Sequence, residues 1–424
     1  MTGVASTLAS RPQAAWKSVK QAFTAWGPGA VLLMAILGPQ DLITNAATGA
    51  AHGYGLVWTL PIVIVARYTL LEAGARYVIA TGESLLEGYS RLSSWFLWCL
   101  LGGIFFKRLS SNLYELLLMA DTTSWLTNER LSYGRFVWGV VYWAAGFLLI
   151  WRGGYRVIER VSVGFAVLLG TALSISAGLS VWTRGSFDVQ SLAPRFPSFH
   201  TDAPLFLLAL IGSGVGSLSN LKYPALIHHK GWRSLAELAQ QRRDLKLSVL
   251  GLLVMTALIQ ILAANTLGGQ PIEDAEDLLN AFSAQLGELG RLGVGIGVLV
   301  VTFSTFVGSN LGYTLIGVQI LEALRKHRPV PEEAYTQRAY RVLLLLFLLP
   351  PLTGLFTQWQ PIWIAIISAA LLAGLLPLVV IGIVLLTRDR SRMGTLANRR
   401  WQNVWLVTLV VAVSVLVVQN LLRR

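Results

Sequence analysis

Two glycine-containing segments hold the residues of this 424-residue chain best suited to bind an ion. The first is Gly38-Pro39-Gln40-Asp41, and the second runs from Gly212 to Ser217 with Pro224 beyond it. Proline lacks the backbone N–H that donates a helical hydrogen bond, and glycine adds conformational freedom to the backbone, so each segment is expected to interrupt a helix. Freed N–H groups at a helix start attract anions, and free carbonyls attract cations. The candidate substrate-binding residues are Gly38, Pro39, Gln40, Asp41, Gly212, Ser213, Gly214, Gly216 and Ser217.

Charged side chains inside apolar stretches form a second group of candidates. They are Lys107, Arg108, Glu115 and Lys222. Charges at membrane depth are costly and usually serve function. Other interpretations stay open: Lys107 and Arg108 could extend toward an interface, Glu115 could pair with a basic residue, and Lys222 could be a charge at the membrane edge.

The elements that carry these residues are predicted to be membrane-spanning helices. The chain is 54% hydrophobic and 13% charged, whereas soluble proteins carry about 25% charged residues. This composition excludes a soluble enzyme, a disordered chain and a disulfide-rich secreted domain. A span needs roughly 20 apolar residues. Eleven stretches fit: 24–48, 54–79, 95–124, 135–151, 155–181, 203–228, 246–268, 291–324, 340–356, 360–387 and 401–422.

The basic residues sort onto alternate loops of this eleven-span arrangement. The N-terminal segment and the loops near residues 91, 152–160, 230–246, 325–338 and 388–400 are rich in Lys and Arg, while loops 269–290 and 357–359 have none. Basic loops stay in the cytoplasm, so we expect a cytoplasmic N-terminus and an external C-terminus in the plasma membrane (inner membrane) of a prokaryote. Topology therefore accounts for most of the formal net charge of +13, and nucleic acid is not an expected partner.

The two interruptions fall in spans one and six, the first members of two five-span halves. Corresponding breaks in two halves are typical of a transporter's binding site, although simple kinks would give the same pattern. The predicted parts are a cytoplasmic segment 1–23, repeats 24–181 and 203–387, and an accessory helix 401–422. The fold class is all-α, with helices 1 and 6 broken.

Several runs resemble the Nramp family of divalent-metal transporters over nearly the whole chain. They are Gly27-Pro28-Gly29, Gly53-Tyr54 to Trp58, Thr81-Gly82, Arg156 with Glu159, Gly212, Ser304-Thr305, and Pro377 through Arg390 with Met393-Gly394. The resemblance implies a LeuT-like fold with an inverted repeat and alternating access.

The site residues depart from the family pattern. The family's Asp-Pro-Gly-Asn reads Gly38-Pro39-Gln40-Asp41 here. The family's Met ligand and the Pro-His pair after it match Gly216, Ser217 and Leu218, and a Gln in span ten matches Ala369. Loss of the thioether implies loss of selectivity for soft metals.

Two functions follow. The first is symport of a small anion such as bicarbonate with Na⁺ or H⁺, since metal ligands are missing while basic and Gly-rich elements are present. In this reading Asp41, Ser304 and Thr305 serve the coupling ion, by resemblance to Na⁺ sites of this fold; ordinary helix packing is the alternative for the hydroxyl pair. The second is Mg²⁺ or Mn²⁺ transport through Asp41 and backbone carbonyls.

The remaining predictions concern what the chain does not need. No nucleotide-binding loop or catalytic group is present, so we expect neither an ATP-driven pump nor an enzyme. No cofactor is expected beyond a bound Na⁺. The expected partners are a small inorganic ion and the lipid bilayer, and the chain is expected to be a monomer.

Overall fold

The computed structural model describes residues 38–128, 133–152, 155–184, 193, 202–216, 218–230, 232–326 and 337–422, although some side chains at helix ends lie outside the description. Within these ranges the chain is helical and forms no strand. The longer helices are α4 (Pro39–His52), α5 (Thr59–Thr81), α7 (Ser94–Thr127), α8 (Gly134–Arg152), α9 (Tyr155–Arg184), α10 (Ala203–Gly214), α11 (Lys222–Lys230), α12 (Leu235–Leu267), α14 (Gly287–Lys326), α15 (Gln337–Leu348), α16 (Pro361–Ala373), α17 (Leu376–Thr387) and α19 (Arg400–Leu422). Short elements join them: α6 (Leu85–Leu92), η2 (Leu218–Leu221), α13 (Ala275–Ser283), η4 (Pro350–Phe356), α18 (Arg390–Met393) and η5 (Gly394–Leu396).

The predicted membrane spans are helical wherever the structure describes them. Among the residues that the structure describes, seven segments are long and apolar enough to cross a membrane. Helices α5 and α7 have 23 and 34 residues, which suffices to span, but both carry buried charges such as Arg67 and Lys107. The eleven-span arrangement is consistent with this structure.

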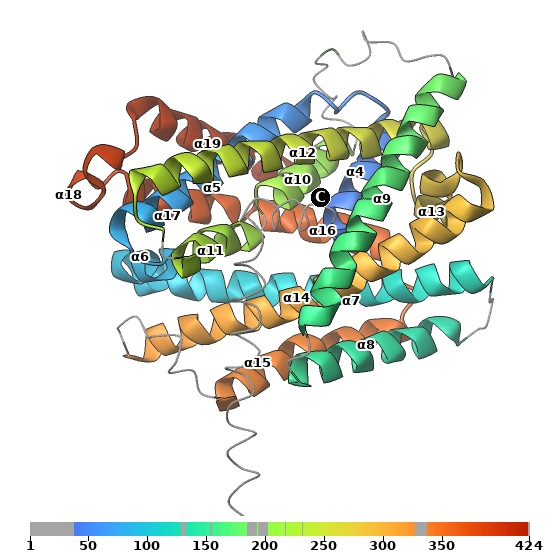
Figure 1. Ribbon diagram of the computed structural model, residues 1–424, viewed down its shortest axis with the longest axis horizontal. Helices are drawn as coiled ribbons and strands as arrows, with labels where there is room; N and C mark the ends of the chain where they lie inside the picture. Colours follow the sequence, from blue (N-terminus) through green and yellow to red (C-terminus); the bar gives the residue numbers. More distant parts are fainter. Residues whose placement is uncertain are drawn as a thin grey trace, which may run out of the picture.

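The elements of the site meet in the middle of the bundle. Helix α4 packs against α10, α12 and α16, and α10 packs along α16; Figure 1 shows α4, α10 and α16 near the centre of the view. Helices α7 and α14 run alongside each other below them, and α8 and α15 lie beyond. Every residue of α4 from Pro39 to Ala50 is buried.

The structure differs from the prediction in three places. Helix α12 begins at Leu235, ahead of the predicted span at 246–268, so Arg242 and Arg243 lie on the helix before that span. Its start is fixed by a capping box, in which Ser234 and Glu237 satisfy each other's backbone N–H groups. The sixth span breaks after Gly214, so Gly212 and Ser213 are helical. The tenth span is also broken, because α16 ends at Ala373 and α17 starts at Leu376.

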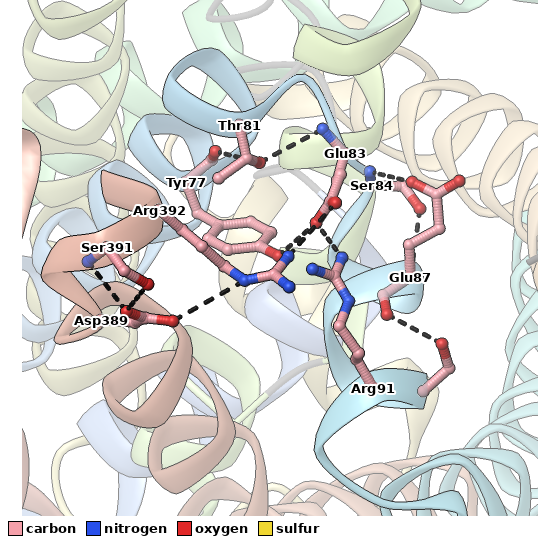
Figure 2. Close-up of polar contacts among 10 residues, drawn as sticks. Tyr77, Thr81, Glu83, Ser84, Glu87, Arg91, Asp389, Ser391 and Arg392 are labelled. Carbon is pink, nitrogen blue, oxygen red and sulfur yellow. Dashed lines mark hydrogen bonds and ion pairs between the residues drawn. The ribbon is translucent and has the colours of Figure 1, made fainter. Parts of the chain in front are cut away.

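Interactions at the two ends of the bundle support the predicted sorting of loops. Figure 2 shows Glu83, between α5 and α6, within reach of Arg91 and of Arg392 on α18. At the opposite end of α7, Arg135 bonds Asp121 and the carbonyl of Trp359. Each contact joins loops that the charge pattern assigned to the same side. The orientation of the N-terminus stays a prediction.

Candidate functional site

Asp41 lies in the first turn of α4, where the chain enters the helix from Gly38. Proline is favoured at a first helical position, and Pro39 occupies it with Gly38 before it. The N–H of Leu42 donates to the Gly38 carbonyl over 3.1 Å, which is the first turn's hydrogen bond. Asp41 is 8% exposed. At the predicted break in the first span, the structure therefore shows the start of a helix at Pro39, directly after residue 38, where the described residues begin.

Helices α4 and α10 meet through hydroxyl groups beside Asp41. The Thr44 hydroxyl donates to the Gln40 carbonyl at 2.8 Å and lies 3.1 Å from the Ser213 hydroxyl. Ser213 also interacts with the Asp41 side chain. The structure thus brings together Gln40, Asp41 and Ser213, as the sequence predicted.

Two cations face this junction from other helices. Lys107 on α7 donates a hydrogen bond to Gln40 Oε1. Arg67 on α5 and Lys107 both act electrostatically on Asp41. Lys107 and Arg67 are 6% and 3% exposed, so the interpretation that Lys107 extends toward an interface was wrong. Sequence reasoning missed Arg67, although a charge inside the second predicted span was the same signal that singled out Lys107.

Arg108 belongs to a buried network between α7 and α14 that adjoins Lys107. Its guanidinium forms an ion pair of 3.5 Å with Glu115 and donates to Asn112 and, over 3.3 Å, to Asn310. It also lies over the ring of Tyr313, 5.6 Å from the centroid. The prediction that Glu115 pairs with a basic residue is confirmed. The interpretation that Arg108 extends toward an interface was wrong.

The predicted glycines of span six have a packing role. A Cβ built on Gly212 would lie 1.7 Å from the Ala369 carbonyl oxygen, and one on Gly216 would lie 3.1 Å from the Ala373 Cα. Small residues on both helices therefore let α10 and α16 approach closely. Whether Gly212, Gly214 and Gly216 also bind substrate stays a prediction.

The other predicted residues are not placed at this junction. Ser217 and the side chain of Lys222 lie outside the described residues. Ser304 and Thr305 are half-buried on α14, and the Ser304 hydroxyl donates to the Val301 carbonyl at 3.3 Å. Within the described ranges no hydrogen bond links either hydroxyl to Asp41, so their coupling role stays a prediction.

Two further polar regions lie at the ends of the bundle. On the predicted cytoplasmic side, Glu72 of α5 accepts from Arg242 of α12 at 2.8 and 2.9 Å. At the opposite end a cavity of about 600 Å³ opens between α7, α8, α13 and α14. Its polar lining includes Asp121, Arg135 and Arg291.

In the described part of the chain, no group of three or more His, Cys, Asp or Glu side chains is arranged so that it could hold a metal ion. Among the described residues, the atoms around Asp41 that could bind a metal ion are mostly oxygens, but the only carboxylate among them is that of Asp41, and two cationic side chains, Arg67 and Lys107, act on it. Sequence reasoning also missed the third break, between α16 and α17, whose signal is Gly374 followed by Pro377.

Comparisons with known proteins identify the family. The model described as "Natural resistance-associated macrophage protein-like" matches residues 29–423. This chain belongs to the Nramp family of transporters. Two relatives named divalent metal cation transporter MntH come from Deinococcus radiodurans and Bacillus subtilis. They are 24% and 23% identical, covering 93% and 94% of this chain and 89% and 92% of their own lengths.

Solved structures agree on the fold. A manganese transporter of Eremococcus coleocola, crystallised as the mutant H236A, aligns with a TM-score of 0.65 at 17% identity, covering 94% of this chain and 85% of its own. MhsT in complex with L-phenylalanine aligns with a TM-score of 0.58 at 14% identity, covering 93% and 97%. The predicted LeuT-like fold is confirmed. This Nramp-family chain is therefore a multi-pass membrane protein.

Proposed function

We propose that this Nramp-family chain moves a hard divalent cation, Mg²⁺ or Mn²⁺, by alternating access. The buried Asp41 carboxylate at the junction of α4 and α10 carries the proposal. Around it stand the oxygen atoms of Gln40, Thr44 and Ser213. Mg²⁺ keeps several waters and needs one or two carboxylates, so this set suits a partly hydrated ion.

The names of the relatives support a divalent cation over the bicarbonate that the sequence first suggested. Both bacterial relatives are named divalent metal cation transporters. The predicted Na⁺ or H⁺ coupling, the monomeric state and the prokaryotic plasma membrane remain part of this proposal. The proposal also includes that the protein has no enzymatic activity and needs no cofactor beyond Na⁺.

A second candidate, transport of a small anion such as bicarbonate, has one specific observation in its favour. Arg67 and Lys107 both act electrostatically on Asp41. At 4 Å, two unit charges interact by roughly 4 kcal/mol at an effective dielectric constant of 20, so cations near the site oppose a divalent substrate. The sign of the substrate charge is the question that an experiment must answer.

Uptake into proteoliposomes answers it. Purified protein is tested for dye-detected Mn²⁺ and Mg²⁺ influx and for labelled bicarbonate uptake, with and without a Na⁺ gradient. Cation influx that Asp41→Asn abolishes supports the proposal. Glu276→Gln, an exposed acid on α13, is the matched control and should transport normally. Bicarbonate uptake without cation influx replaces the proposal with the second candidate, and absence of all uptake by folded protein rejects both.

A further inference from the structure

Two buried side chains at the central junction have hydrogen-bond donors that find no partner among the described residues. The Nε and Nη1 atoms of Arg67 and the Nε2 atom of Gln40 make no hydrogen bond within the described part of the chain. These side chains belong to residues that are 3% and 7% exposed. Buried donors are normally satisfied, and leaving one unpaired is costly. Gln40 adjoins Asp41 in the chain, and Arg67 acts on Asp41 electrostatically. Three such donor atoms on these two residues indicate a ligand that accepts hydrogen bonds.

The position of Arg67 on α5 directs it toward the break in the sixth span. A Cβ on Gly214, at the end of α10, would meet Val63 at 2.4 Å, and a Cβ on Gly74 would meet Pro224 of α11 at 2.8 Å. Val63, Arg67 and Gly74 lie on one face of α5, because steps of four and eleven residues return to nearly the same helical direction. Arg67 therefore lies between the contacts that α5 makes before and after the break.

The charges at the centre do not balance. Arg67 has Asp41 as its electrostatic partner, and Lys107 is influenced by Glu115, Arg108 and Asp41. Arg108 and Glu115 form their own ion pair. These five residues carry three positive and two negative charges, which leaves one positive charge in excess. Buried charges require compensation, and an anion would supply it.

We propose that Arg67, Lys107 and Gln40 form an anion subsite beside Asp41 that takes a small inorganic oxyanion. The inference rests on the proposed function, because it assumes that this junction is the substrate site. It also deepens that function: the anion would enter together with a divalent cation at Asp41 and would offset part of the positive charge that the cation, Arg67 and Lys107 bring to this junction. Planar oxyanions present several lone pairs to N–H donors that come from three helices.

Binding of labelled bicarbonate to the purified full-length protein is the first test. Wild type should bind, and Arg67→Gln should weaken binding by about tenfold or more, since a charge-assisted hydrogen bond is lost. Arg67→Lys keeps the charge and should lose less. Arg400→Gln, an exposed arginine on α19, is the matched control and should bind as wild type does. If Arg67→Gln does not fold, as judged by size exclusion, Lys107→Gln takes its place.

The second test measures Mg²⁺ binding in bicarbonate and in gluconate buffer. Bicarbonate should strengthen Mg²⁺ binding, and Mg²⁺ should strengthen bicarbonate binding by the same factor, since linkage is reciprocal. No bicarbonate binding to folded wild type, or equal binding by Arg67→Gln and Arg400→Gln, overturns the subsite. Cation influx that needs no anion overturns the subsite and leaves the proposed function intact. Bicarbonate binding without cation influx keeps the subsite and rejects divalent-cation transport.

Discussion

Gly212 on α10 and Ala369 on α16 meet backbone to backbone, because a Cβ on Gly212 would lie 1.7 Å from the Ala369 carbonyl oxygen. This contact fixes the position of α10 at the residue directly before Ser213. The Ser213 side chain contacts Thr44 and interacts with Asp41. The glycine thus positions the site by permitting close approach. Any side chain at 212 must push the two helices apart.

Gly212→Ala should therefore destabilise the protein by about 1–3 kcal/mol, the usual cost of overpacking. The obstacle is backbone, which cannot rotate away as a flexible side chain would. Thermal unfolding of the purified protein in detergent measures the effect. Gly178→Ala on α9 is the control, since a Cβ there meets nothing within 4 Å and alanine favours a helix. Equal stability of the two variants would show that α10 and α16 separate freely.

The sequence predicted the helical elements well and the partners of the charged residues poorly. Runs of apolar residues located the spans, and the segment from Gly212 to Ser217 marked the break in span six, which begins after Gly214. Lys107 was a candidate for the ion pathway because charged side chains at membrane depth are costly and usually serve function. Arg108 follows it directly, but successive residues on a helix point in different directions, and α14 offers Asn310 as a partner. Such pairings depend on which helices become neighbours.

Glu72→Gln should lower the free energy of unfolding by about 1–3 kcal/mol, since a buried carboxylate loses its charge-assisted bonds. The Glu72 side chain is 5% exposed and pairs with Arg242, which is 43% exposed, and with Arg76, which is 4% exposed. Arg76 keeps its hydrogen bonds to Asn398 and Gln402 when the carboxylate is lost, which keeps the estimate below that for a buried ion left without any partner. Glu83→Gln provides the comparison. Its ion pairs with Arg91 and Arg392 are exposed, so the change should be below about 1 kcal/mol. Chemical unfolding of the two variants side by side checks the order.

The start of α12 should be sensitive to acid. Backbone N–H groups of Arg233 and Ser234 and the Ser234 hydroxyl lower the pKa of Glu237. A carboxyl whose pKa is lower in the folded state stabilises the fold above its unfolded pKa of about 4.3, and this stability is lost as the pH falls through the folded pKa. Wild type should therefore melt at a higher temperature than Glu237→Gln at pH 7, and the gap should close toward pH 3. A gap independent of pH would exclude this contribution of the charge.

The Arg108–Glu115 pair offers a test of how a buried ion pair behaves between α7 and α14. Both side chains are 1% exposed, so Glu115→Gln leaves an uncompensated guanidinium and should cost about 3–5 kcal/mol. The double variant Arg108→Met with Glu115→Gln removes that charge and should regain much of the loss, as exchange of a buried pair for uncharged residues often does. Unfolding of wild type, both single variants and the double variant completes the cycle. If the double variant is less stable than Glu115→Gln alone, the bonds of Arg108 to Asn112 and Asn310 outweigh the ion pair.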